Sequence, residues 1–266
     1  MVDKVLHAQR DGAIVTLTID DPTTRNALSA QLAAELVSAI AGINADPSIS
    51  CVILTGAGEV FCAGGNIKDM YARRNHFAGN AAEIRHHYQH GVQTIARAFY
   101  DSDVPMIAAV NGPAMGAGLD FAMMCSIRIA SDRAIFAESF IKLGLVSAAG
   151  GAWFLTRAIG GSAAAELTLT GDTIDAQRAL ALGIVSRVTP AEGLLDEARE
   201  IASRIIRHPA QSIRLNTRLL RDAARLDLPA TLEISSGLQA IAQQTEDQYE
   251  AVSAIVEKRS PTFKGR

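Results

Sequence analysis

Two glycine-rich segments are the places in this chain where the backbone itself can do chemistry. The first runs from Phe61 to Met70 (FCAGGNIKDM) and the second from Asn111 to Asp120 (NGPAMGAGLD), and each directly follows an apolar, strand-like run. Backbone N–H groups converge on a negatively charged oxygen only where side chains are small enough for close approach. The two segments therefore predict the halves of an oxyanion hole, and with it chemistry at a polarised carbonyl group.

The elements around these segments alternate between strands and helices. Alternating or continuous apolar runs predict strands at 13–19, 51–54, 106–110, 127–130 and 134–136. Apolar residues spaced by three and four predict helices at 30–43, 81–99 and 116–124. Residues 1–190 are thus predicted to form a layered α/β core of parallel character.

After residue 149 the pattern becomes mainly helical. It predicts one more strand at 183–188 and helices at 191–206, 209–226 and 229–257. Residues 191–266 are therefore predicted to form a separate C-terminal helical region.

Composition and charge narrow the class of protein. The chain has 266 residues, is 48% apolar and has a net charge of -3, which gives no general attraction to nucleic acid or to anionic membranes. Its N-terminus is polar, and no stretch approaches eighteen apolar residues, so we expect a cytoplasmic protein without membrane spans. Cys51, Cys62 and Cys125 lie in apolar contexts without metal-ligand spacing, which predicts reduced thiols and no metal site.

An alternative interpretation of the second glycine segment, a dinucleotide-binding site, does not match the full motif. Gly116-Ala-Gly118 after an apolar strand resembles a dinucleotide-binding fingerprint, but the third small residue of that fingerprint should stand at position 121. This position holds Phe121. A dinucleotide site is therefore not expected.

Six short segments together carry a resemblance to a known family. They are Cys62–Lys68 (CAGGNIK), Ala108–Gly112 (AAVNG), Gly116–Gly118, Ala122–Cys125 (AMMC), Leu169–Asp172 (LTGD) and Glu257–Arg259 (EKR). Their order and spacing resemble those of the crotonase family of enoyl-CoA hydratases and isomerases across nearly the whole chain. The resemblance implies a crotonase-like spiral of repeated β-β-α units with a C-terminal helical subdomain. Residues 191–266 would form this subdomain and serve as the trimerisation region of a homotrimer or a dimer of trimers.

The same resemblance implies a substrate and its binding residues. The substrate would be an acyl thioester of coenzyme A, so that coenzyme A arrives as part of the substrate and no separate cofactor is expected. The thioester oxygen would be held by the backbone N–H groups of Gly65 and Ala117, the second of which opens a helix and gains from its dipole. Coenzyme A would contact Arg25, Asn26, Ala63, Gly64, Gly65, Ile67 and Lys68, with Phe263 and Lys264 reaching in from the tail, often of a neighbouring subunit.

The acid–base groups depart from the pattern of family hydratases, which carry two glutamates. At the corresponding positions this chain has Asp120 and Phe140. Asp120 falls one helical turn after Ala117 on the same face, which suits a base; the alternative is an acid favoured there by the helix dipole. Phe140 cannot transfer a proton. Its phenyl ring would exclude water from its side of the cavity, and this desolvation would raise the pKa of a remaining carboxyl group.

Glu138 is the candidate for the missing carboxylate. If residues 137–140 are extended, Glu138 and Phe140 face the same way and Glu138 approaches Asp120. Two carboxyl groups at close range share a proton and supply one acid and one base. Otherwise Glu138 is a partly solvated acid or a hydrogen-bonding helper. Some family isomerases and dehalogenases carry an aspartate just before the next glycine pair, but here Ser147-Ala148-Ala149 precedes Gly150, so Ser147 is expected to make a polar contact only.

A cluster of histidines lies between the two glycine segments. His76, His86, His87 and His90 are expected on a solvated helix face, although an inward-pointing His86 or His90 would be able to act as a general base.

The predicted function is that of an enzyme that stabilises a thioester enolate. Hydration of a trans-2-enoyl-CoA comes first, because the motifs as a whole resemble hydratases. The alternatives are an enoyl-CoA isomerase with Asp120 as its single base, and an acyl-CoA-binding protein that has lost catalysis. The acyl chain cannot be read from the sequence.

Overall fold

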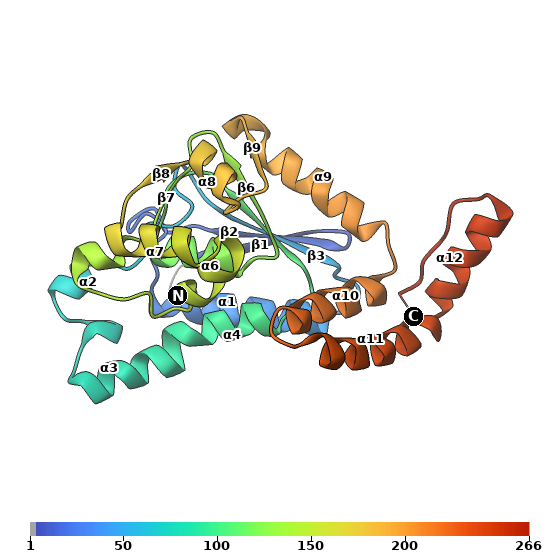
Figure 1. Ribbon diagram of the computed structural model, residues 1–266. Coiled ribbons are helices and arrows are strands. Elements are labelled where there is room, and N and C mark those ends of the chain that lie inside the picture. The colour runs from blue at the N-terminus through green and yellow to red at the C-terminus, as the bar shows by residue number, and fades with distance from the viewer. Residues whose placement is uncertain (1–3, 266) are drawn as a thin grey trace.

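The computed structural model describes residues 4–265 and is built around a six-stranded sheet (Figure 1). The strand order is β1-β2-β3-β4-β6-β9; β1 is antiparallel to β2, and all other neighbours are parallel. The strands are β1 (Leu6–Asp11), β2 (Ile14–Ile19), β3 (Cys51–Gly56), β4 (Met106–Val110), β6 (Ile127–Ser131) and β9 (Arg187–Thr189). All six residues of β3 are buried, as expected for a central parallel strand covered on both faces.

A second, three-stranded sheet supports the glycine-rich segments. It has the order β5-β7-β8, made of β5 (Ala114–Met115), β7 (Ile135–Ala137) and β8 (Ile174–Asp175). Strand β5 lies just before the helix that begins at Ala117, and β7 lies directly before Glu138. Because β5 and β7 pair, the small sheet places the start of that helix beside the segment that carries Glu138.

Helices cover both faces of the main sheet. On one face, α9 buries Leu194, Ala198, Ile201 and Ala202 against apolar residues of the strands, while α1, α4 and α5 pack against the other face. The α-helices are α1 (Ala30–Ala45), α2 (Ile67–Tyr71), α3 (Ala81–His87), α4 (Gln93–Asp101), α5 (Ala117–Met124), α6 (Gly151–Ile159), α7 (Gly161–Thr170), α8 (Ala176–Leu182), α9 (Leu194–Ile206), α10 (Ala210–Ala223), α11 (Leu228–Gln243) and α12 (Glu246–Glu257). Shorter helical turns are η1 (Asn75–Phe77), the π-helical η2 (Tyr88–Val92), η3 (Ser139–Leu143) and η4 (Ala191–Gly193).

Two of the predicted helices are interrupted. The helix predicted over 81–99 is divided into α3 and α4 by the π-helical turn η2, which contains Gly91. The helix predicted over 229–257 ends at Gln243, and a new helix begins after Thr245, whose hydroxyl accepts the backbone N–H of Gln248. A capping threonine followed by acidic residues is a start signal for a helix, so two helices form where the sequence pattern predicted one.

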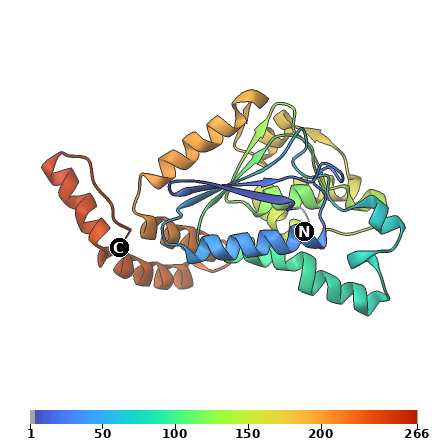
Figure 2. The same ribbon diagram turned by 180° about the vertical axis from the view of Figure 1, so that it is seen from behind.

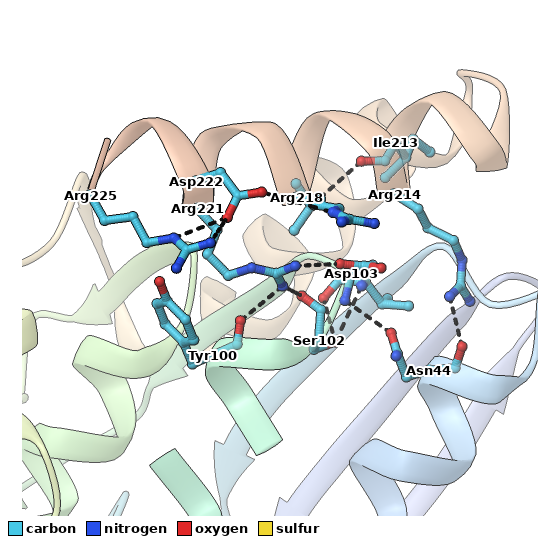
Figure 3. Close-up of polar contacts among 12 residues, drawn as sticks. Asn44, Tyr100, Ser102, Asp103, Ile213, Arg214, Arg218, Arg221, Asp222 and Arg225 are labelled. Carbon is cyan, nitrogen blue, oxygen red and sulfur yellow. Dashed lines mark hydrogen bonds and ion pairs between the residues drawn. The ribbon is translucent and has the colours of Figure 1, made fainter. Parts of the chain in front are cut away.

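Helix α10 joins the C-terminal helices to the core through arginine side chains (Figure 3). Arg214 donates to the carbonyl oxygens of Asn44, Asp46 and Ile49 at and beyond the end of α1, at distances of 2.6 to 3.1 Å. Arg221 donates to carbonyl oxygens at the end of α4 and pairs with Asp103 at 2.9 Å. These cations satisfy carbonyl groups that a helix leaves without partners at its C-terminal end.

Helix α11 lies against α10, and α12 extends away from the body of the molecule (Figures 1 and 2). They expose apolar side chains, namely Leu228, Leu232, Ile241, Tyr249, Val252, Ile255 and Val256. The trimerisation role predicted for residues 191–266 stays a prediction, and so does the division at residue 190. Within the described residues, no helix is both long and apolar enough to cross a membrane.

Candidate active site

The two glycine-rich segments lie against each other, as the sequence predicted. The backbone N–H of Cys62 donates to the carbonyl oxygen of Pro113 at 3.1 Å, and that of Met115 donates to the carbonyl oxygen of Cys62 at 3.0 Å. Gly64 has a φ of +87°, and a Cβ atom at this position would lie 2.4 Å from the carbonyl oxygen of Met115. The close approach therefore requires glycine at position 64.

The predicted oxyanion donors lie next to this junction. Ala117 is the first residue of α5, after Gly116, which has a φ of +50° and donates its N–H to the carbonyl oxygen of Ala137 at 2.8 Å. Within residues 4–265, the backbone N–H groups of Gly65 and Ala117 donate to no protein acceptor. Both donors are thus available to a ligand, and that of Ala117 lies at the positive end of a helix dipole.

Asp120 is fully buried on the first turn of α5. The hydroxyl group of Ser147 donates to its carboxylate, with distances of 3.2 and 3.4 Å to the two oxygens. Burial and the negative charge of Glu138 raise the pKa of Asp120 well above its usual range, while hydrogen bonds from Ser147 and from the backbone N–H of Gly151 oppose this shift. The predicted polar contact of Ser147 is therefore with the candidate base itself.

Glu138 lies close enough to Asp120 for each carboxyl group to shift the pKa of the other. The extended backbone over 137–140, on which the sequence argument depended, does not form, because residues 139–143 form the 3-10 helix η3 and Glu138 directly precedes it without a capping hydrogen bond. Its side chain is 1% exposed, and burial raises its pKa to about 7. Neither carboxyl oxygen of Glu138 has an N–H or O–H donor in the described part of the chain. A hydrogen bond between Glu138 and Asp120 thus requires a proton on one of the two carboxyl groups.

Apolar side chains close the space around the two donors. A Cβ atom on Gly116 would lie 3.5 Å from the Phe140 ring and 3.3 Å from the hydroxyl oxygen of Ser139, so a phenyl ring and one hydroxyl group border the start of α5. The terminal methyl of Met70 lies 2.4 Å from the position of a Cβ on Gly65, and the Phe77 ring lies beyond it. Met70 is a flexible side chain that a ligand can displace. Neither this contact nor the one between Gly151 and Asp120 was predicted from sequence patterns.

The residues predicted to hold coenzyme A divide into a surface group and a structural one. Arg25, Ile67 and Lys68 are exposed beside the first glycine segment, and the N–H of Ala63 donates to the carbonyl oxygen of Arg25 at 3.1 Å. Asn26 is buried instead, and its side chain bonds the backbone of Asp21, Ala57 and Val60. These hydrogen bonds stabilise the backbone around Asn26, so its observed contacts are structural.

Phe263 and Lys264 do not lie near the other predicted residues of the same chain. The tail folds back along α12, where the N–H of Lys264 donates to the carboxylate of Asp247 at 2.6 Å. This end of the molecule is opposite to α2 and α3 in both views (Figures 1 and 2). A contact of the tail with coenzyme A would therefore have to come from another copy of the chain.

The histidine cluster is separate from the carboxyl pair. His86 and His90 are exposed, as expected for a solvated helix face, whereas His76 and His87 are half-buried. None of them is among the groups that shift the pKa of Asp120.

Comparison with known proteins shows the family and the fold of this chain. Residues 9–266 match the family model described as enoyl-CoA hydratase/isomerase. A probable enoyl-CoA hydratase of Mycobacterium bovis is 37% identical over the full length of both chains. The 1,2-epoxyphenylacetyl-CoA isomerase of Escherichia coli is 32% identical over 95% of each chain. The crystal structure of an enoyl-CoA hydratase from Bacillus anthracis superimposes with a TM-score of 0.92 and 31% identity, covering 98% of this chain and 100% of that one.

The fold and the site together define an acyl-CoA-processing enzyme of the crotonase type, which confirms the predicted fold class. The chain belongs to the enoyl-CoA hydratase/isomerase family.

Proposed function

We propose that the protein hydrates a trans-2-enoyl-CoA and that Asp120 and Glu138 act together as its acid and base. The observation that carries the proposal is the buried carboxyl pair, in which Glu138 lacks any other hydrogen-bond donor among the described residues. Such a pair retains one proton near neutral pH, because burial and mutual repulsion disfavour two negative charges. It therefore offers one carboxylic acid and one carboxylate side by side.

These two forms are what hydration requires. The carboxylate takes a proton from water as the water oxygen bonds to C3 of the enoyl group, and the π electrons move toward the thioester oxygen. The resulting enolate is stabilised by the N–H groups of Gly65 and Ala117, a type of donor whose loss costs roughly a hundred- to a thousandfold in rate. The carboxylic acid then gives its proton to C2, and the pair again holds one proton.

Coenzyme A binding is proposed to use the exposed cations beside the first glycine segment. Arg25 and Lys68 would meet its phosphates, and Ile67 would cover the adenine. Phe263 and Lys264 would complete the site from another subunit of a trimer or hexamer. Coenzyme A is here part of the substrate, with no further cofactor.

An enoyl-CoA isomerase is the second candidate. The position where family hydratases carry their second glutamate holds Phe140, whose ring borders Gly116, and moving a double bond needs only one base. Asp120 would then carry the proton between two carbons while Glu138 sets its pKa.

The test is an assay of the protein with a trans-2-enoyl-CoA and with a 3-enoyl-CoA, followed by absorbance and mass. Hydration is expected, seen as addition of one water to the trans-2-enoyl substrate, and loss of it in Asp120→Ala while the CoA ester still binds. Isomerisation of the 3-enoyl substrate without water addition would replace the first candidate by the second. Binding without turnover of either substrate would indicate a protein that only holds acyl-CoA.

A further inference from the structure

A cavity of about 570 Å³ lies between the beginning of α1 and the segment formed by η1, α3 and η2. The α1 helix runs alongside α4 in both views (Figures 1 and 2), and it also contacts η2. The cavity has two chemically different walls. The apolar wall is formed by Leu28, Ala30, Ala33, Ala34 and Val92, and the polar wall by Asn75, His76, His86, His87 and His90.

The imidazole groups of the polar wall are close together and only partly paired. The ring centroids of His86 and His90, one helical turn apart, are separated by 4.3 Å. The Nδ1 atom of His87 is shielded from solvent and has no hydrogen-bond partner among the described residues. Because buried polar atoms in proteins nearly always have a partner, the atom of His87 points to a missing ligand or solvent molecule.

The lining of the cavity offers hydrogen-bond donors to an anion and holds no side chain of fixed charge, and burial lowers the pKa of His76. No Asp or Glu is among its lining residues, and the nearby Asp69 already accepts a hydrogen bond from Asn75 at 2.9 Å. Helix α1 has no acidic residue in its first turn, so its positive end lacks a neutralising side chain. Imidazoles supply N–H donors whether neutral or protonated. In the described part of the chain, no three His, Cys, Asp or Glu side chains are arranged to hold a metal ion.

We propose that this cavity binds an aliphatic carboxylate. The hydrocarbon part would lie on the α1 wall and the carboxylate would accept hydrogen bonds from the imidazoles. The volume falls within the range of about 300 to 1,000 Å³ that small-molecule sites occupy. The carboxylate has two possible sources, namely the far end of an acyl chain attached to coenzyme A, and a free acid. Only the first source depends on the proposed function, because the cavity uses neither Asp120 nor Glu138.

Calorimetric titration with octanoate and with 1-octanol tests the site without any turnover. Octanoate is expected to bind at one site, at least about tenfold more tightly than the alcohol, a difference of about 1.4 kcal/mol. The double variant His86→Gln/His90→Gln, both exposed positions, should remove this preference, and His87→Gln should weaken it. His208→Gln changes an exposed histidine outside the cavity and should leave binding unchanged.

A second pair of titrations distinguishes the two sources. Adipyl-CoA binding more tightly than hexanoyl-CoA, with the preference lost in the double variant, would assign the carboxylate to the acyl chain. Octanoate binding without any such preference would assign it to a free acid. The proposal is overturned if octanoate binds no better than octanol and adipyl-CoA no better than hexanoyl-CoA, or if the histidine variants leave a preference intact.

Discussion

A carboxyl group buried beside another carboxyl group keeps its proton to a higher pH than it would in water. Asp120 and Glu138 are both in this situation, with 0% and 1% exposure, and the pKa of Glu138 rises to about 7. The chemistry of the site thus depends on two side chains from different elements, one on α5 and one at the end of β7. The pKa of each carboxyl group, and with it its role as acid or base, depends more on the neighbouring groups than on whether the residue is Asp or Glu.

The carboxyl pair predicts how stability depends on pH. Because folding raises the pKa of Glu138 from 4.5 to about 7, the folded state holds a proton that the unfolded state has lost, and wild type loses stability as pH rises through that window. Glu138→Gln removes this effect, and relieves Asp120 of a neighbouring charge. Its free energy of unfolding relative to wild type should therefore increase between pH 4.5 and pH 8, by roughly 1.4 kcal/mol per pKa unit. Urea denaturation at both pH values measures the free energy of unfolding of the variant and of wild type. If the difference between the two proteins is the same at pH 4.5 and pH 8, the carboxyl pair is not buried as described.

Ser147 predicts a shift in the pH profile of activity. Its hydroxyl group stabilises the Asp120 carboxylate, so Ser147→Ala should raise the pKa of Asp120 further. In the pH profile of kcat, the rising limb should then move to higher pH. Near neutral pH, kcat should fall about tenfold, the size expected for the loss of a hydrogen bond to a charged group. Ser147→Thr keeps the hydroxyl group and should restore the wild-type profile. A profile that does not move in Ser147→Ala would show that this bond does not set the pKa.

At the scale of elements, the site depends on how closely α6 approaches α5. A Cβ atom on Gly151, the first residue of α6, would lie 1.6 Å from a carboxyl oxygen of Asp120. Gly151→Ala should therefore displace Asp120 or α6, abolish most activity and cost about 1 to 3 kcal/mol of stability. Gly161→Ala is the matched control at the start of α7, because nothing lies within 4 Å of its Cβ position. Equal activity and melting temperature in the two variants would contradict the described packing.

At the scale of the whole molecule, the exposed apolar surface of α11 and α12 predicts association. Ile255 and Val256 on α12 are 78% and 76% exposed, and from this exposed apolar surface we predict an interface between chains. Analytical ultracentrifugation should give the mass of a trimer or hexamer for wild type. Ile255→Glu should give smaller species with unchanged circular dichroism, whereas Leu169→Glu, an exposed apolar position on α7, should not. A monomeric wild type would contradict the prediction.

The sequence was sufficient for the fold and for the meeting of the two glycine segments, because these depend on local patterns and on small residues at fixed spacing. It did not predict how Glu138 reaches Asp120, since the turn of η3 after β7 has no strong local signal. It also missed the contacts of Met70 and Gly151, which depend on how separate elements pack. The start of a new helix at α12 is indicated in the sequence by Thr245 and the acidic residues after it.

Asp120 and Glu138 are proposed to work as one acid–base pair in adding water to an enoyl thioester. This pairing is tested by the turnover of a trans-2-enoyl-CoA in ¹⁸O-labelled water by wild type and by Glu138→Gln, with binding of the CoA ester measured in parallel. Wild type is expected to give a labelled 3-hydroxyacyl product, and the variant at least about a hundredfold slower labelling with binding retained. Labelling by Glu138→Gln at the wild-type rate would show that Glu138 takes no part in adding water.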